Sequence, residues 1–113
     1  MLHMSRLPLR PTLVAVLQAL TAGARHGFDV INATGLPSGT VYPALARLEH
    51  DGLVESRWED HKLAQKEKRP PRRYYEVTTA GDKMLATAVA ALKERERSAR
   101  ARLRAFKPVK VSR

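Results

Sequence analysis

The segment from Ser38 to Glu49 constrains the fold of this chain more than any other feature. At 100° per residue its apolar side chains fall on one face: Val41, Ala44, Leu45 and Leu48. The residues on or near the other face are small or polar: Thr40, Pro43, Ala46, Arg47 and His50. The pattern predicts a helix with one buried face and one thin polar face. Such a helix either inserts its polar face into a groove of DNA or is an ordinary amphipathic core helix.

Pro43 affects where this helix begins. Ser38 is a typical N-cap residue, but a helix that begins there leaves Pro43 without a hydrogen bond to Gly39 and crowds the Gly39 carbonyl. We therefore expect the regular helix to begin near Thr40, or to bend there. Gly39 would let a phosphate approach the first free N–H groups, where the helix dipole favours an anion.

Two shorter helices are expected before this segment, at residues 11–21 and about 26–34. Pro11 suits a first helical turn, and Gly23 ends the first helix. Gly35 supplies a left-handed stop for the second. The first helix carries an apolar stripe at three- and four-residue steps: Leu13, Val16, Leu17 and Leu20. The second carries three apolar side chains: Phe28, Val30 and Ile31.

After Asp51-Gly52 the pattern changes to that of a β-hairpin. Residues 53–59 and 72–77 predict two strands, joined by a polar loop from Asp60 to Pro71. The second strand alternates three side chains on one face: Arg73, Tyr75 and Val77. The loop carries four cations: Lys62, Lys66, Lys68 and Arg69. Such a hairpin is a wing that can contact phosphates or the minor groove, and the alternative is a solvated charged loop.

The last predicted helix is capped by Thr78 or Thr79 and extends to about Phe106. Its length of about 42 Å exceeds what the core of a small domain can cover. One face follows alternating steps of four and three residues, a heptad seam interrupted by one acid: Leu85, Val89, Leu92, Glu96, Ala99, Leu103 and Phe106. The seam predicts a partner helix and therefore a homodimer, and the alternative is packing within one chain.

The net charge of +10 predicts a polyanionic partner, for which nucleic acid is the leading class and an anionic membrane surface the other. Residues 93–113 hold nine basic and two acidic side chains, so +7 of the charge lies there. Because these arginines surround the helix, a solvated surface and a further nucleic-acid contact both remain open. At 113 residues, we expect one domain of ordinary size.

Other function classes lack their motifs. The absence of cysteine excludes a thiolate metal site, and the four histidines, His3, His26, His50 and His61, are too scattered to predict a metal. Residues 35–40 lack the spacing and lysine of a P-loop. We expect no catalysis, no cofactor and no metal. The absence of cysteine also fits a reducing compartment, so we expect a cytoplasmic protein. The uncharged run over residues 11–24 is shorter than the roughly 20 residues that span a bilayer, so we expect no membrane segment.

These motifs resemble the PadR family of transcriptional regulators over about residues 9–92. His26-Gly27-Phe28 is similar to the family's His-Gly-Tyr segment, and residues 38–45 resemble its recognition-helix signature. Residues 47–54 resemble the junction between helix and wing, and residues 69–81 the wing exit and the start of the final helix. Phe28 departs from the usual tyrosine, because it lacks the hydroxyl that would contact a phosphate.

The resemblance implies a dimeric winged-helix repressor. The expected fold class is mainly α with a small β-hairpin: a winged helix-turn-helix domain over residues 1–78, a C-terminal dimerisation helix over 79–106 and a basic tail over 107–113. The chain would be a compact member with a single C-terminal helix. The arginine-rich tail has no counterpart implied by the family.

The recognition helix, about residues 38–51, is expected in the major groove, and the basic wing, about 59–73, on the DNA backbone or in the minor groove. The expected DNA contacts are Ser38, Gly39, Thr40, Tyr42, Pro43, Arg47, Lys62, Lys66, Arg69, Arg72 and Arg73. The expected dimerisation residues are Leu85, Val89, Leu92, Ala99, Leu103 and Phe106. Two copies would read a pseudopalindromic site in double-stranded DNA with centres about 34 Å apart.

Two further alternatives follow. Some family members sense small aromatic compounds, and three aromatic residues are candidates for such an effector pocket, with core and hairpin packing as the alternative: Trp58, Tyr74 and Tyr75. The basic tail also fits a nucleoid or RNA-binding protein without sequence preference. Competition between a specific promoter and bulk DNA separates that function from a specific regulator.

Overall fold

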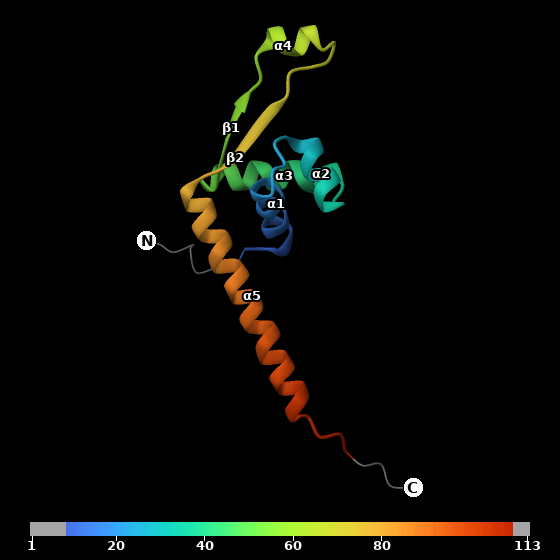
Figure 1. Cartoon of the computed structure of the whole chain (residues 1–113), viewed down its shortest axis with the longest axis vertical. Helices are drawn as coiled ribbons and strands as arrows, with labels where there is room; N and C mark the ends of the chain where they lie inside the picture. Colours follow the sequence, from blue (N-terminus) through green and yellow to red (C-terminus); the bar gives the residue numbers. More distant parts are fainter. Residues whose placement is uncertain (1–8, 110–113) are drawn as a thin grey trace.

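The computed structural model describes residues 9–109 and has the predicted fold class, mainly helical with one antiparallel hairpin (Figure 1). Its elements, in chain order, are α1 (Pro11–Thr21), α2 (Gly27–Thr34), α3 (Ser38–His50), β1 (Val54–Trp58), α4 (His61–Lys66), β2 (Arg73–Val77) and α5 (Thr79–Ala105). The last four residues of the predicted basic tail, and His3, lie outside the described residues.

The core lies where α1, α2 and α3 meet the base of the hairpin. Its fully buried side chains come from the three predicted apolar stripes and from β1: Val16, Leu17, Val30, Val41, Leu45, Leu48 and Val54. Burying one such side chain stabilises the fold by about 1.5–3 kcal/mol. The same packing determines which face of α3 remains exposed, because its four predicted core residues are all buried.

The predicted start of α3 near Thr40 is wrong, because the helix begins at Ser38 with Pro43 inside it. Pro37, not Ser38, is the N-cap residue, and its carbonyl accepts from the N–H groups of Thr40 and Val41 at 2.9 and 3.0 Å. Pro37 is extended, with φ −71° and ψ 158°, as suits the residue before a helix. Pro43 removes one bond to the Gly39 carbonyl, and Gly39 is exposed, so water can satisfy that carbonyl.

The two strands pair antiparallel in a register that runs from Val54 opposite Val77 to Trp58 opposite Arg73. Their bounds confirm the predicted strands to within one residue at each end. A short third segment, which the sequence did not indicate, pairs with the other edge of β2: His26 forms a bridge with Tyr74, and the Tyr75 N–H donates to the Arg25 carbonyl at 2.8 Å. The hairpin is thereby joined to the residues directly before α2.

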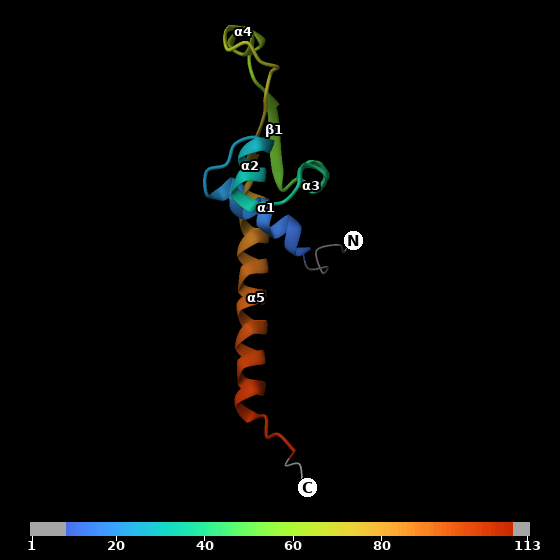
Figure 2. The same ribbon diagram turned by 90° about the vertical axis from the view of Figure 1, so that its right-hand side faces the viewer.

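The predicted loop between the strands is also wrong, because it contains the six-residue helix α4 at the far end of the hairpin (Figures 1 and 2). The Asp60 carboxylate caps α4 by accepting from the Lys62 N–H at 2.8 Å. Ala64 is buried, and its carbonyl accepts from the Arg69 N–H as the chain returns. Lys68 takes the left-handed conformation, φ 56°, after the helix. The tip is therefore a small folded unit.

The long helix α5 begins as predicted, with the Thr78 hydroxyl accepting from the Gly81 N–H at 3.0 Å. Met84 and Leu85, near its start, pack against the core. Its remaining length leads away from the body, opposite to the wing (Figures 1 and 2). Leu92 and Leu103 are 45% and 72% exposed in the single chain. Among residues 9–109 no helix combines the length and the apolar content that crossing a bilayer requires.

Candidate nucleic-acid interface

The first part of the candidate interface is the face of α3 that points away from the core. Ser38, Gly39, Tyr42, Pro43 and Arg47 are exposed there, while Thr40 is half-buried. The Arg47 Nε donates to the Asp51 carboxylate at 2.9 Å. Because an exposed ion pair of this kind contributes little stability, Arg47 can exchange Asp51 for a phosphate or a base at little cost.

Tyr42 has a contact that sequence reasoning missed. Its ring lies against Gly27, the first residue of α2, so closely that a Cβ at Gly27 would overlap the ring. The tyrosine is nevertheless 47% exposed. Gly27 therefore allows Tyr42 to lie between α2 and α3 with one side free. In the sequence, the only indication of this contact was a glycine at the start of the second helix together with a tyrosine in the recognition helix.

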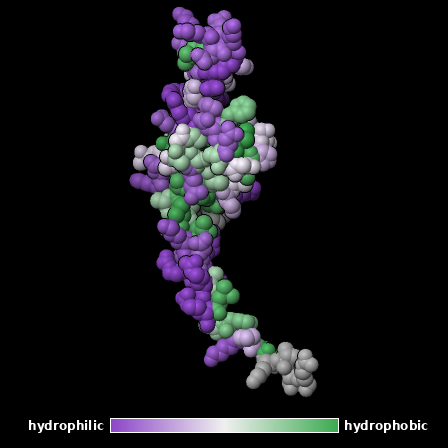
Figure 3. All heavy atoms as spheres, turned by 45° about the vertical axis from the view of Figure 1, so that its right-hand side comes forward, coloured by the Kyte–Doolittle hydropathy of each residue, from purple (hydrophilic) through white to green (hydrophobic). Residues whose placement is uncertain are grey.

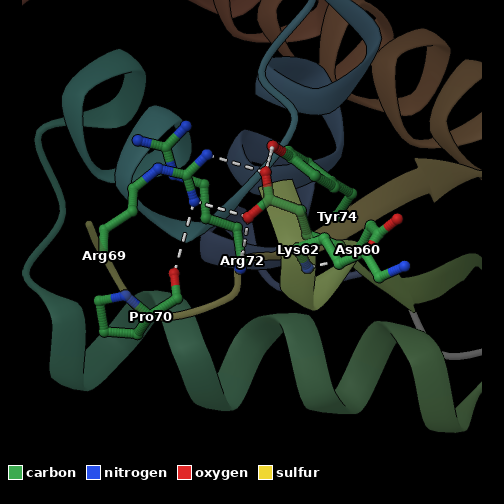
Figure 4. Close-up of polar contacts among 7 residues, drawn as sticks. Asp60, Lys62, Arg69, Pro70, Arg72 and Tyr74 are labelled. Carbon is green, nitrogen blue, oxygen red and sulfur yellow. Dashed lines mark hydrogen bonds and ion pairs between the residues drawn. The ribbon is translucent and has the colours of Figure 1, made fainter. Parts of the chain in front are cut away.

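The base of the wing, where residues 59 and 72 adjoin the outer ends of the two strands, contains a carboxylate that accepts several hydrogen bonds (Figure 4). Glu59 accepts from Arg69 Nη1 and Nη2 at 2.6 and 2.8 Å, and its side chain is only 2% exposed. The Tyr74 hydroxyl donates to the same carboxylate at 3.0 Å, and the Arg72 N–H donates at 3.2 Å. The hydrogen bonds from Arg69, followed by those from Arg72 and Tyr74, lower the pKa of Glu59 to about 2, although burial opposes the shift.

This network engages Arg69, which the sequence suggested as a DNA contact. The Arg69 guanidinium faces inward onto Glu59 and is 23% exposed, and Glu59 raises its pKa further. A guanidinium that already makes a bidentate bond to a buried carboxylate has little left to offer a phosphate. Arg69 therefore holds the two sides of the wing together. Its role was not visible in the sequence, because Glu59 lies ten residues earlier.

A second arginine links the wing to α3. Arg73 donates from Nε to the Ser56 hydroxyl at 2.8 Å and from Nη2 to the Glu49 carboxylate at 3.2 and 3.3 Å. Ser56 in turn donates to Glu49 at 2.6 Å. Glu49 lies in the last turn of α3, and the other two residues lie on the paired strands. The predicted contact Arg73 therefore links the paired strands of the wing to the end of α3.

Four cations of the wing remain exposed: Lys62, Lys66, Lys68 and Arg72. Three of them, Lys62, Lys66 and Lys68, lie at the wing tip, which is largely hydrophilic in Figure 3. The structure thus brings Lys62 and Lys66 together on α4. It leaves Arg72 on the segment that returns from the tip, one residue before β2. These three predicted contacts are free to meet a polyanion.

The three aromatic candidates for an effector pocket do not share one. Tyr74 lies on one face of the hairpin, between the guanidinium groups of Arg25 and Arg57 at 4.8 and 5.9 Å from its ring centre. Tyr75 and Trp58 project from the other face, by their places in the register. Burial raises the pKa of Tyr75. Both tyrosines line an open groove of about 950 Å³ along the sheet, whereas Trp58 does not.

The predicted dimerisation residues divide into two groups. Leu85 packs against the core, and Val89 and Ala99 are half-buried within the single chain. Leu92, Leu103 and Phe106 are exposed, and Phe106 is the C-cap residue that follows α5. Figure 3 shows hydrophobic side chains along this part of the molecule. The exposed group is the part of the seam that the chain itself leaves uncovered.

A metal site has no donor set in the described part of the chain. Within residues 9–109 no three side chains among histidine, aspartate and glutamate lie close enough to hold one ion.

Comparison with known proteins identifies the family. The sequence profile described as "Transcriptional regulator PadR-like family" matches residues 16–87, well over half of the chain. A PadR-like transcription factor from Bacteroides fragilis is similar in structure, with 26% identity, a TM-score of 0.68, and coverage of 79% of this chain and 86% of that one. A search of curated protein sequences found no match.

Two further solved structures share the fold. A PadR family transcription regulator from Clostridium difficile is 21% identical with a TM-score of 0.70, over 81% of this chain and 97% of that one. BpsR from Bordetella bronchiseptica, whose DNA binding 6-hydroxynicotinic acid regulates, is 21% identical with a TM-score of 0.64 over 80% of this chain. This chain spans only 64% of BpsR. With its exposed α3 face, basic wing and matching profile, the chain belongs to the PadR-like family of DNA-binding transcriptional regulators.

Proposed function

We propose that this chain acts as a homodimeric repressor, in which each copy inserts α3 into the major groove and rests its wing on the adjacent backbone or minor groove. The observation that carries the proposal is the link between the two surfaces. Arg73 joins the wing to Glu49 of α3, so the polar face of α3 and the basic wing tip meet DNA as one rigid unit. A fixed angle between them lets one surface position the other.

In this arrangement the first turn of α3 anchors the helix to a phosphate. The N–H groups of Ser38 and Gly39 precede the first bonds to the Pro37 carbonyl, and the positive end of the helix dipole lies there. Thr40 and Pro43 line the same approach. Tyr42 and Arg47 reach bases or phosphates further along α3. Sequence preference would arise from these side chains and from DNA shape.

The wing supplies affinity that depends little on sequence. Lys62, Lys66 and Arg72 are the proposed phosphate contacts, because they are exposed cations on or beside the wing tip. Arg69 and Arg73 support the wing from within, through Glu59 and Glu49. Each phosphate neutralised steepens the dependence of log affinity on log salt by about 0.9.

The second copy would pair through α5. The exposed apolar residues Leu92, Leu103 and Phe106 lie beyond the part of α5 that contacts the body. An uncovered seam on a 27-residue helix suits a symmetric partner. The dimer would place two α3 helices about one DNA turn apart on a pseudopalindromic operator. Bound across a promoter in the cytoplasm, it would exclude RNA polymerase.

An effector would act by binding the DNA-free arrangement of the dimer more tightly than the DNA-bound one. The regulation of BpsR by 6-hydroxynicotinic acid supports an aromatic effector class for this fold. The open groove beside Tyr74 and Tyr75 is the described cavity where such a compound would be sought.

Selection from a pool of random duplexes tests the proposed function. The full chain is incubated with the pool, and bound duplexes are recovered and sequenced over several rounds. An enriched inverted repeat, with half-sites about 10 base pairs apart, is expected. A pool that stays random after selection would overturn the proposal. Sedimentation of the free chain tests the dimer separately.

One observation favours a second function, non-specific nucleic-acid binding. Residues 93–107 carry seven basic and two acidic side chains, and all nine are exposed. One weak ion pair, Arg97 to Glu94 at 3.7 Å, offsets this charge within the described helix. A nucleoid protein would use this segment and show little preference among sequences.

A further inference from the structure

The most exposed large hydrophobic side chain on the hairpin strands is Trp58, at the outer end of β1. Its side chain is 62% exposed. In the free protein the indole therefore contributes only part of the stabilisation that full burial of a tryptophan would give. It does not line the groove that contains Tyr74 and Tyr75. Neither core packing nor that groove therefore accounts for its position.

The strand register places Trp58 on the same side of the wing as α3. Alternate residues of β1 share a face, so Trp58 lies on the face of Val54, which is buried in the core, and of Ser56, which bonds to Glu49 of α3. The neighbouring Arg57 projects from the other face, toward Tyr74. Trp58 thus overhangs the angle between α3 and the wing.

The indole is also held in a defined orientation. Arg73, its partner across the strands, places its guanidinium 5.4 Å from the centre of the indole ring. The same guanidinium is bonded to Ser56 and Glu49. Because Arg73 is held by these two side chains, the indole that stacks on it is positioned before any partner binds.

We propose that Trp58 is a DNA contact. Its indole packs on a deoxyribose and donates its Nε1–H to a phosphate. That phosphate lies between the major groove that α3 enters and the part of the duplex that the wing covers. This inference rests on the proposed docking of α3 and the wing. The backbone strand that borders the major groove must cross the angle between these two elements. An indole offers that strand an apolar face and one donor without adding charge.

The salt dependence of binding distinguishes an uncharged DNA contact such as Trp58 from the lysine contacts of the wing. Trp58→Ala is expected to weaken binding about tenfold, the range of one hydrogen bond to a charged group, with an unchanged slope of log affinity against log salt. Trp58→Phe keeps the stacking on Arg73 and removes only the donor, so its effect should be smaller. Arg57→Ala, one residue away on the opposite face, is the matched variant and should leave affinity at fixed salt nearly unchanged.

The wild-type protein supplies an independent test, because Trp58 is its single tryptophan. The full chain is titrated with a fluorescein-labelled duplex recovered from the selection, and anisotropy reports binding while acrylamide quenching reports the accessibility of Trp58. Binding accompanied by protection of Trp58 from acrylamide is the expected result. Binding by anisotropy with unchanged quenching, or with Trp58→Ala as tight as wild type, would overturn this inference and leave the proposed function intact. Failure of anisotropy to detect binding would instead contradict the proposed function and the inference with it.

Discussion

Arg69 and Glu59 form a bidentate ion pair across the base of the wing, with nitrogen–oxygen distances of 2.6 and 2.8 Å. The pair closes the segment that contains α4, since the two residues lie just before and just after it. Arg73 and Glu49 form a corresponding link nearer the body of the molecule, between the wing and α3. Two arginines that the sequence suggests for phosphates thus determine the shape of the surface that presents the lysines.

Replacing Arg69 with alanine should loosen the wing, because it leaves the Glu59 carboxylate buried without its main donor. The expected results are a lower melting temperature and faster proteolysis between residues 59 and 72. Arg69→Lys should recover only part of the stability, since lysine cannot make the paired bonds. An alanine variant with wild-type melting and proteolysis would show that the pair contributes nothing to the wing.

Acid should remove the same contribution to stability. The pKa of Glu59 is lowered from 4.5 to about 2 in the folded chain, so the unfolded chain binds the proton more readily. Stability from this carboxylate is therefore fully present above pH 4.5 and is lost as pH falls from 4.5 toward 2. Urea unfolding across this range should show a steeper decline for wild type than for Glu59→Gln. Parallel curves for the two proteins would contradict the assignment.

Gly27→Ala should disturb Tyr42, because the added Cβ overlaps its ring. We expect the free energy of unfolding to fall by about 1 kcal/mol. This is the low end for overpacking, because the ring can move outward into solvent. In a Tyr42→Ala background the same change should be neutral or stabilising, as the obstacle is gone. A double-mutant cycle from urea unfolding measures the coupling, and additive costs would exclude the contact.

Leu92→Glu should give monomers, because it places a charge in the exposed seam of α5. Ala101→Glu is the matched variant, since Ala101 is exposed on the opposite side of the helix. Sedimentation is expected to find monomers for the first and dimers for the second, with unchanged helical content in both. A dimeric Leu92→Glu protein would assign the interface to another surface.

Removing two lysines from the wing tip should flatten the salt dependence of DNA binding. For Lys62→Ala combined with Lys66→Ala, the slope of log affinity against log salt should fall by about 0.9 for each phosphate that the variant no longer neutralises. Lys83→Ala removes an exposed charge near the start of α5, away from the wing tip, and should leave the slope unchanged. Equal slopes for the double variant and wild type would remove α4 from the interface.

The sequence predicted the parts of the fold that follow local rules. The stripes that contain Leu17 and Leu45, the stop at Gly35 and the cap at Thr78 each depend on neighbouring residues, and the structure confirms them. Helix α4 was missed because six residues are too few for a periodic pattern. The start of α3 was misplaced because the penalty at Pro43 falls on an exposed carbonyl, which water can satisfy.

The candidate site was predictable only in part, for a similar reason. Exposure of Arg47 follows from the helical period, so the pattern placed it on the polar face. The partners of Arg69 and Arg73 are ten and 24 residues away along the chain, and no spacing rule connects them. Whether an arginine meets DNA or a carboxylate depends on strand register and on the path of the wing, which only the folded chain provides.

The most direct measurement is a competition between a selected duplex and bulk genomic DNA for the full chain. A fluorescein-labelled selected duplex is displaced by either competitor at near-physiological salt. We expect the selected duplex to compete roughly a thousandfold more effectively per site than bulk DNA. Competitors that are equally effective per site would contradict sequence-specific regulation and would favour a non-specific nucleic-acid-binding protein.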